Sequence, residues 1–339
     1  MRRPRTLVKA IIRQKYGSPD VLELTEVETP APKDNEVLVE IHAASANPLD
    51  WHYMRGAPFL ARLGEGLRKP RDTRLGVDIA GRVEAVGNNV TQFQPGDEVF
   101  GVCAGGFAEY ASARENKLAL KPANISFEEA AAVPVAAITA LQGLRDKGKI
   151  QPGQKVLVNG ASGGVGTFAV QIARSFGTEV TGVCSTRNLD MVRSIGADHV
   201  IDYTQEDFTR NGQRYDLIYD AVGNRSVSAY KRALSPQGTC VIIGFSSLSG
   251  LFAHVVLGPL MSMRGNKKVG LMGRAEMNQK DLVYVKELLE EGLVVPVIER
   301  RYPLRETASA LRYLEEGHAR GKVVITVDQN NNTSLSIPT

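Results

Sequence analysis

Cysteine, tryptophan and long apolar runs are scarce in this chain of 339 residues. Its three cysteines include no Cys-x-x-Cys pair, so a disulfide framework is not expected. No run of 18 apolar residues occurs, which argues against a transmembrane helix. The first residues lack the apolar core and the cleavage site of a secretory signal. We therefore expect a cytoplasmic protein without a membrane span.

The surplus of positive charge is small and forms no stripe along the chain. The formal net charge is +4 and the pI is near 8.9, while 43% of the residues are hydrophobic, as is usual for soluble globular proteins. Basic and aromatic residues do not alternate as they do in nucleic-acid-binding segments. We interpret the one dense basic cluster as a frayed, solvated terminus, with a nucleic-acid or targeting role as the alternative: Arg2, Arg3, Arg5, Lys9 and Arg13.

The first third of the chain has a β-rich pattern. Short apolar runs are separated by turns that contain glycine and proline, such as Gln94-Pro95-Gly96-Asp97. This pattern predicts a barrel-like or sandwich-like domain. The runs that we expect to be strands cover residues 8–12, 37–43, 79–86, 98–102 and 107–112.

Strands and helices alternate after Ser126, where Ser-x-x-Glu predicts the start of a helix over 128–147. Such alternation predicts a parallel, doubly wound sheet, which makes this an α/β chain. After Gly292 the pattern returns to strands, so we predict one domain from residues 1–128 and 293–339, and an inserted Rossmann domain from 129–292. The expected strands are 155–159, 179–184, 199–201, 217–220, 239–243, 269–272, 294–300 and 322–327, and the expected helices are 164–176, 188–195, 226–234, 279–290 and 306–316.

A glycine-rich loop between a predicted strand and a predicted helix carries the strongest signal. Residues 155–166 read KVLVNGASGGVG, with glycines at 160, 163 and 166. Glycine lets the backbone approach a pyrophosphate, and the helix that follows directs free N–H groups and its positive dipole end at that anion. We therefore expect a dinucleotide to be bound here, by Gly160, Ser162, Gly163, Gly164, Val165 and Gly166.

The end of the next strand indicates which nicotinamide dinucleotide is preferred. NAD sites usually carry an acidic residue there, which holds the ribose hydroxyls. This chain has Ser185, Thr186 and Arg187 instead. Two hydroxyls and a guanidinium suit a 2′-phosphate, so the sequence favours NADPH over NADH. The alternative is that Arg187 is only an exposed residue at a helix start.

The chain resembles the medium-chain dehydrogenase/reductase superfamily, specifically its zinc-independent quinone oxidoreductase-like branch, from about residue 8 to residue 327. This resemblance implies a GroES-like β-rich catalytic domain and a Rossmann domain. It also implies a homodimer joined through the edge of the parallel sheet, with 239–243 or 269–272 as the edge strand. Besides the glycine loop, the segments that carry it are ANPLD (46–50), LGVDIAGRV (75–83), VG (86–87), QPGDEV (94–99), GFAEY (106–110) and HARGKVV (318–324).

The metal ligands of the zinc-dependent relatives are missing. Those relatives have a cysteine near the position of Asn47, and Gly-His-Glu where this chain has Gly76-Val77-Asp78. Valine cannot bind a metal, and asparagine is a poor zinc ligand. Of their four-cysteine structural loop, only Cys103 is present. We expect no metal, which favours acceptors whose conjugation spreads the developing negative charge.

The resemblance also indicates which residues face the nicotinamide and the substrate. Asn47 and Asp50 are expected there, as a ligand of the carboxamide or a donor to the substrate oxygen, with His52 and Tyr53 as candidate proton donors. The alternatives are a helix N-cap for Asp50 and a neutral surface histidine for His52. Further cofactor contacts are expected from Thr139, Tyr203, Gly223, Gly244, Phe245, Arg320 and Lys322, although the last two are otherwise ordinary solvated charges.

The expected function is NADPH-dependent hydride transfer to a small-molecule quinone or α,β-unsaturated carbonyl compound. One alternative is an enoyl-thioester reductase of a lipid or polyketide pathway, which the same glycine loop would serve. Alternatives of another class are a nucleic-acid-binding protein and a protein that binds NADPH without turnover. The stretch 246–273 is rich in glycine, methionine and leucine, and it suits either a lid over the substrate or a surface excursion.

Overall fold

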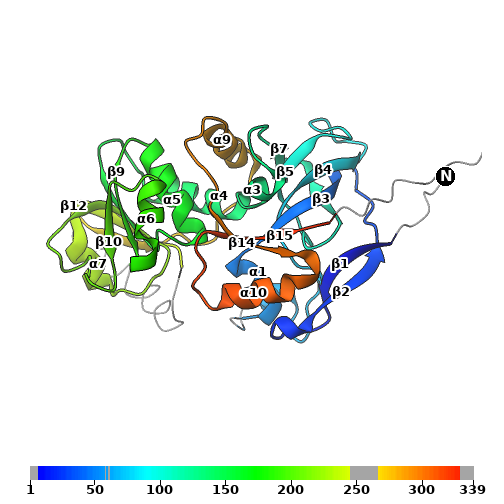
Figure 1. Cartoon of the computed structure of the whole chain (residues 1–339), viewed down its shortest axis with the longest axis horizontal. Helices are drawn as coiled ribbons and strands as arrows, with labels where there is room; N and C mark the ends of the chain where they lie inside the picture. The colour runs from blue at the N-terminus through cyan, green and yellow to red at the C-terminus, as the bar shows by residue number, and fades with distance from the viewer. Residues whose placement is uncertain (1–6, 58, 60–61, 245–265, 329–339) are drawn as a thin grey trace, which may run out of the picture.

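The two large sheets lie at opposite ends of the molecule (Figure 1). The computed structural model describes residues 7–57, 59, 62–244 and 266–328. Helices α3 (Phe127–Ala131) and α4 (Pro134–Gln142) lie between the sheets. Phe245 and most of the stretch 246–273 lie outside the described residues.

The first of these sheets has six strands, and every neighbouring pair is parallel. Its order, β10-β9-β8-β11-β12-β13, is that of a doubly wound dinucleotide-binding fold, and it confirms the predicted fold class. The order reverses between β8 and β11, where a crevice opens at the carboxyl ends of the strands. The strands are β8 (Lys155–Asn159), β9 (Glu179–Cys184), β10 (His199–Asp202), β11 (Tyr215–Asp220), β12 (Leu234–Ile242) and β13 (Lys268–Leu271).

Strand β8 is apolar because both of its faces are covered. Val156 and Val158 join a core with helices on one face, while Leu157 joins a second core on the other. Successive side chains of a strand point to opposite faces, so a run of three apolar residues suits a central parallel strand. The helices that connect or cover these strands are α5 (Gly164–Ser175), α6 (Leu189–Ser194), α7 (Val227–Ala233) and α9 (Gln279–Glu290).

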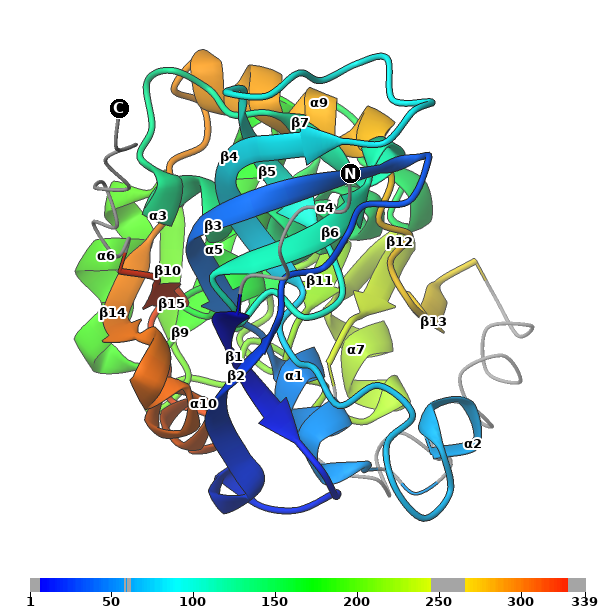
Figure 2. The ribbon, with the colours of Figure 1, turned by 90° about the vertical axis from the view of Figure 1, so that its right-hand side faces the viewer.

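The second sheet has seven strands and is mostly antiparallel. Its last two strands come from the end of the chain, because β15 pairs with β3. A separate hairpin of β1 (Leu7–Arg13) and β2 (Leu22–Glu28) lies beside it, near α1 (Pro48–Arg55) and α10 (Thr307–Glu315) (Figure 2). The sheet consists of β3 (Glu36–Ala46), β4 (Asp78–Val86), β5 (Glu98–Val102), β6 (Tyr110–Arg114), β7 (Leu118–Leu120), β14 (Ile298–Pro303) and β15 (Lys322–Thr326).

Three expectations about local structure are wrong. The helix predicted over 128–147 is two helices followed by a π-helical turn at 143–147, and α4 begins at Pro134, which has no N–H to continue the preceding helix. The strand predicted from residue 294 begins at Ile298. The basic start is not simply frayed, since β1 begins at Leu7 and Arg13 is buried.

Within the described ranges, no helix is both long enough and apolar enough to cross a membrane.

Candidate functional site

A cleft of about 1860 Å³ lies between the two sheets and brings together most of the residues that the sequence indicated. The glycine loop, the ends of β9, β11 and β12, and helix α1 all contribute to its walls. The predicted residues that line it are Asn47, Asp50, His52, Tyr53, Thr139, Gly160, Ser162, Gly163, Gly164, Val165, Gly166, Ser185, Arg187, Tyr203 and Gly244.

Four predicted residues do not line this cleft: Thr186, Gly223, Arg320 and Lys322. Gly223 is buried between two lining residues, and its amide donates to Asp220 over 2.7 Å. The amide of Arg320 donates to Glu299 over 2.6 Å. Phe245 is outside the described residues.

The glycine loop has the shape that a pyrophosphate requires. Gly160 has φ = 81°, in the left-handed region that glycine favours. A Cβ on Gly166 would lie 2.0 Å from the carbonyl oxygen of Gly160, so only glycine allows this approach of α5 to the loop. Residues 163–166 line the cleft at the start of α5, where free amides and the helix dipole favour an anion. The residues present therefore fit a dinucleotide.

The C-terminal segment closes one side of this loop. Gly321 forms a parallel bridge with Gly163, and its amide donates to the carbonyl of Ser162 over 2.8 Å. A Cβ on Gly164 would lie 3.3 Å both from the carbonyl oxygen of Gly321 and from Cδ of Lys322. The glycine at 164 thus lets the segment 321–322 approach the loop closely.

Asn188 is a site residue that the sequence reasoning missed. Its amide donates to the hydroxyl of Ser162 over 3.0 Å and to that of Ser185 over 3.1 Å. Because each hydroxyl oxygen accepts here, each keeps its own proton for an anion in the cleft. The feature of the sequence that could have indicated Asn188 is its position directly after Arg187, at a predicted helix start.

At the end of β9, one residue differs from the expectation. The hydroxyl of Thr186 donates to Asp202 at the end of the neighbouring strand, so it is not available to a phosphate as predicted. This hydrogen bond holds the pKa of Asp202 below its ordinary value. Arg187 is exposed and lines the cleft, and its Nη2 donates to the carbonyl of His318 over 3.1 Å. Tyr203 is 53% exposed and also lines the cleft.

A buried polar cluster lies where three strand ends meet. It consists of Ser45 near the end of β3, Asn47, Asp78 at the start of β4 and Lys322 at the start of β15, each at most 3% exposed. Asp78 accepts from Ser45 and from the Asn47 amide, both over 2.9 Å, and from the amide of Val135 over 3.0 Å. Lys322 Nζ lies 2.7 Å from Asn47 Oδ1 and 3.4 Å from Asp78.

These contacts correct two expectations. Lys322 is not a solvated charge, and burial lowers its pKa while Asp78 raises it. An ammonium only donates and a carboxylate only accepts, so the orientation of the Asn47 amide is fixed. Both Asn47 amide hydrogens are used, by Asp78 and by the Ser45 carbonyl. Asn47 therefore has no donor left for a substrate oxygen, although Oδ1 can still accept from a carboxamide.

Asp50 is a buried carboxylate that lines the cleft. It is the third residue of α1 rather than its N-cap, and Oδ2 accepts from the amide of Asn47 over 2.7 Å. Its Oδ1 has no hydrogen-bond partner among the described residues. Burial, together with the nearby charge of Asp78, raises the pKa of Asp50 to about 7. Asp50 therefore exchanges a proton near neutral pH.

The two candidate proton donors differ in geometry. Nδ1 of His52 lies 2.9 Å from the carbonyl of Ala57, which can only accept, so the neutral ring carries its proton there. Burial lowers the pKa of His52 and favours that neutral form, which makes it a poor donor to a substrate. The hydroxyl oxygen of Tyr53 accepts a long hydrogen bond of 3.5 Å from Arg274, so the hydroxyl can still donate its own proton to a hydrogen bond with the substrate.

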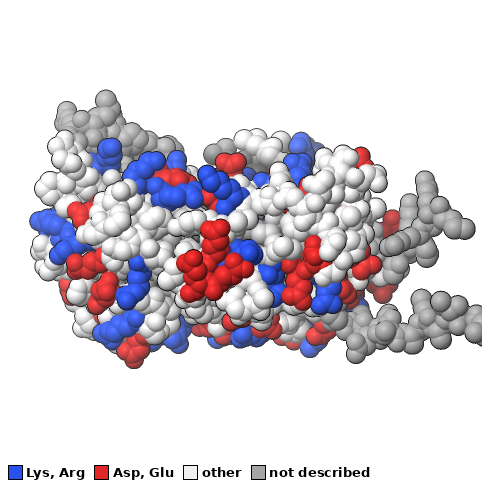
Figure 3. Space-filling view, turned by 90° about the horizontal axis from the view of Figure 1, so that it is seen from above, with Lys and Arg blue, Asp and Glu red and all other residues white. Residues whose placement is uncertain are grey.

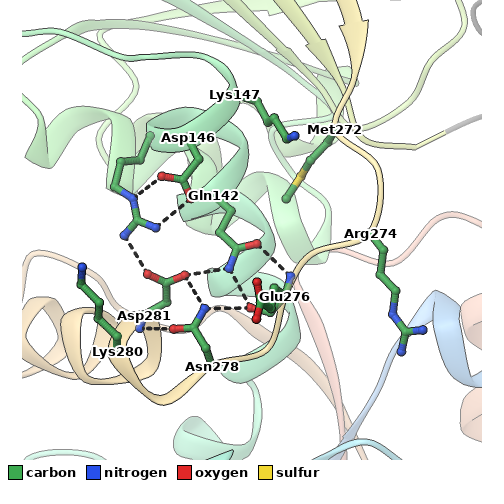
Figure 4. Close-up of a pocket in the computed structure, with 10 residues that line it drawn as sticks. Gln142, Asp146, Lys147, Met272, Arg274, Glu276, Asn278, Lys280 and Asp281 are labelled. Carbon is green, nitrogen blue, oxygen red and sulfur yellow. Dashed lines mark hydrogen bonds and ion pairs between the residues drawn. The ribbon is translucent and has the colours of Figure 1, made fainter.

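Arg274 belongs to a segment that a separate polar network holds in place (Figure 4). Asp281 at the start of α9 accepts from Gln142 over 2.7 Å and pairs with Arg145 over 2.8 Å. Gln142 also bonds the backbone of Glu276, because its Nε2 donates to the carbonyl and its Oε1 accepts from the amide. Arg274 points away from this network in Figure 4, and it lines the cleft.

Among the residues that the structure describes, no group of three or more histidine, cysteine or acidic side chains is placed to hold a metal ion. Of the positions that correspond, by the resemblance, to the zinc site of the relatives, Asn47 and Asp78 are instead bonded to the ammonium of Lys322, and Val77 has no metal-binding side chain.

Comparisons with known proteins identify the family. The Alcohol dehydrogenase GroES-like domain matches residues 33–123, and the family described as Zinc-binding dehydrogenase matches residues 195–325. The Chloroplast envelope quinone oxidoreductase homolog of Arabidopsis thaliana is 33% identical, over 94% of this chain and 98% of its own. The NADPH-dependent alkenal/one oxidoreductase of the same plant is 32% identical, over 94% of this chain and 79% of its own.

A solved structure agrees with these matches. The quinone oxidoreductase from Coxiella burnetii superposes with a TM-score of 0.82 at 30% identity, over 95% of this chain and 100% of its own. The chain belongs to the medium-chain dehydrogenase/reductase superfamily, in its quinone oxidoreductase-like branch.

Replacing Asp50 by asparagine tests the state of this carboxyl group. Its pKa is about 7 in the folded protein and about 4 in the unfolded chain, so its contribution to stability is complete below pH 4 and is lost as the pH rises through 7. The loss amounts to at most about 4 kcal/mol. Denaturant unfolding at several pH values should show that Asp50→Asn loses less stability than the wild type between pH 4 and 8.

The control for this comparison is Asp190→Asn, which replaces a fully exposed carboxylate. It should follow the wild-type pH dependence. Parallel curves for the wild type and Asp50→Asn would mean that folding does not raise the pKa of Asp50.

Proposed function

We propose that this protein is an NADPH-dependent reductase of quinones and α,β-unsaturated carbonyl compounds. The observation that carries the proposal is the buried cluster of Asn47, Asp78 and Lys322, in which Asn47 lines the cleft and Asn47 and Asp78 stand, by the resemblance, where the zinc-dependent relatives have their metal site. An acceptor in this cleft is polarised only by hydrogen bonds, which suits conjugated acceptors. The names of the two plant relatives, a quinone oxidoreductase homolog and an alkenal/one oxidoreductase, support the same class of acceptor.

The proposed cofactor site divides into three parts. The loop 160–166 and the start of α5 bind the pyrophosphate. The hydroxyls of Ser162 and Ser185, oriented by Asn188, bind phosphate oxygens together with Arg187. Oδ1 of Asn47 accepts from the nicotinamide carboxamide. When bound, NADPH supplies the hydride.

The acceptor is reduced by one hydride and one proton. An enone then becomes a saturated carbonyl compound, and a quinone becomes a hydroquinone. Tyr53 is the proposed donor of the hydrogen bond to the acceptor oxygen, because its own oxygen accepts from Arg274 and its proton is free. Asp50, with a pKa of about 7, is a buried group in the same cleft that can replenish a proton.

The other classes of function have less support. Basic and acidic side chains are mixed on the face seen in Figure 3, and acidic groups gather near its centre, which does not suit a nucleic-acid backbone on that face. A protein that binds NADPH without turnover would not need a proton donor such as Tyr53 or Asp50 in the cleft. An enoyl thioester remains a conjugated acceptor that the same groups can reduce.

The proposed assembly is a homodimer joined through β13. This strand is one of the two edge strands of the parallel sheet within the described residues, and an open edge pairs readily with a second copy. A monomeric mass in solution, measured by light scattering, would contradict the dimer.

The acceptor class is tested by following NADPH oxidation with a small quinone, a medium-chain enone and a saturated ketone, with and without a chelator. We expect turnover of the quinone or the enone that the chelator does not change, because no step depends on a metal. Turnover of the saturated ketone alone, lost with the chelator, would contradict the proposed function.

Preference for NADPH is tested by Arg187→Gln. Loss of hydrogen bonds to a charged phosphate should raise the KM for NADPH about tenfold or more, with little change for NADH. Arg193→Gln is the matched control, since Arg193 lies one helix further on and pairs with Asp190. Equal effects of Arg187→Gln on both cofactors would show that Arg187 does not read the 2′-phosphate.

A further inference from the structure

Arg13 is a buried cation that lines the cleft. It ends β1, its side chain is 1% exposed, and its backbone amide donates to the carbonyl of Thr73 over 2.8 Å. Its Nε and Nη1 are buried and have no hydrogen-bond partner among the described residues. Guanidinium groups are almost always paired when they are buried, because an unpaired buried charge is strongly unfavourable. The position therefore calls for an anion.

The nearby acidic groups do not supply that anion. Asp72 bonds Arg74 through both oxygens, over 2.9 and 2.8 Å. Glu65 and Asp72 act on Arg13 only through their charge, and the ring of Tyr16 lies 5.3 Å from its Cζ. Burial lowers the pKa of Arg13, although an arginine stays charged in proteins.

Basic residues outnumber acidic residues in the segment 62–74, which contacts Arg13 through Thr73. The segment 62–74 carries five basic and only two acidic residues, and Arg13, Glu65, Asp72 and Arg74 all line the cleft. Leu75 and Gly76, which follow Arg74 directly, line the cleft together with Asn47 and Asp50. Arg13 and Arg74 therefore belong to the same cleft as Asn47 and Asp50.

We propose that Arg13 binds an anionic group, a carboxylate or a phosphate, that the hydride acceptor itself carries. The inference rests on the proposed function, because it places the acceptor in the same cleft. An anion that enters would turn a lone buried cation into a hydrogen-bonded ion pair, which is much stronger than a neutral contact. Acceptors with such a group are then preferred over neutral acceptors of the same reactivity.

A purely structural role for Arg13 makes a different prediction about stability. If its charge held β1 in place, Arg13→Met would lower the melting temperature and weaken every activity alike. If Arg13 serves a ligand, removing an unpaired buried charge should leave the melting temperature unchanged or raise it. Stability and selectivity together therefore separate the two roles.

The test compares vinyl ketones that carry a terminal carboxylate, on alkyl spacers of increasing length, with their methyl esters. Crotonyl-CoA and the neutral N-acetylcysteamine thioester form a second pair, which separates phosphate from carboxylate as the source of the anion. The wild type, Arg13→Met, Arg13→Lys and the exposed control Arg305→Met are measured with NADPH. Arg305 lies directly after β14 and does not line the cleft.

We expect Arg13→Met to lower kcat/KM for the charged member of one pair by about 10- to 100-fold, as the loss of hydrogen bonds to a charged group implies. The neutral member should change less than about threefold, with an unchanged or higher melting temperature. Arg13→Lys should retain part of the preference, and Arg305→Met all of it. Equal losses for charged and neutral acceptors, or no preference in the wild type, would overturn the proposal.

Calorimetric titration of the same carboxylates keeps this test independent of turnover. Binding to the wild type that Arg13→Met weakens, without reduction of any acceptor, would support the anion site and contradict the proposed function. Reduction of neutral enones with no binding of the carboxylates or of crotonyl-CoA would support the proposed function and contradict the anion site.

Discussion

The ammonium group of Lys322 joins the parts of the molecule from which the site is built. It donates to Asn47 at the start of α1 and pairs with Asp78 at the start of β4, while its own strand, β15, pairs with β3. All of these groups are buried, so the charge of Lys322 has no water to compensate it. In such surroundings a pair holds its geometry closely, because breaking one contact leaves a buried charge unpaired.

Several features of the cleft follow from this constraint. Asn47 is fixed with its carbonyl oxygen toward Lys322, and its backbone amide donates to Asp50, which sets the first turn of α1. That helix carries Tyr53 into the cleft. On the other side, the residue before Lys322 bonds the glycine loop through Ser162. One segment of chain therefore holds the cofactor loop and the acceptor side at a set distance from each other.

Local patterns in the sequence predicted the parts of the fold that depend on local physics. The glycine loop, the apolar strand before it and the alternation of helices and strands are read over short distances, and the parallel sheet has the predicted class. The interruption at Pro134 could have been predicted too, since proline favours the start of a helix. It was missed because the alanines on both sides have high helix propensity.

Long-range contacts were beyond the reach of such patterns. Ser45, Asp78 and Lys322 are far apart in the sequence, and no periodicity indicates that their strands end at one point. For the same reason Arg13 was grouped with a solvated terminus, although the segment that covers it lies some sixty residues later. Thr186 was predicted to bind a phosphate because its acceptor, Asp202, belongs to the neighbouring strand, and no local pattern indicates that contact.

The central claim is that Lys322 and Asp78 form one coupled, buried unit, and a double-mutant cycle measures this most directly. The free energy of unfolding is compared among the wild type, Lys322→Met, Asp78→Asn and the double variant. We expect a loss of about 3–5 kcal/mol for Lys322→Met, which leaves a buried carboxylate unpaired. The double variant should recover part of this loss, with a coupling of about 1–3 kcal/mol. Losses that add within about 0.5 kcal/mol would contradict it.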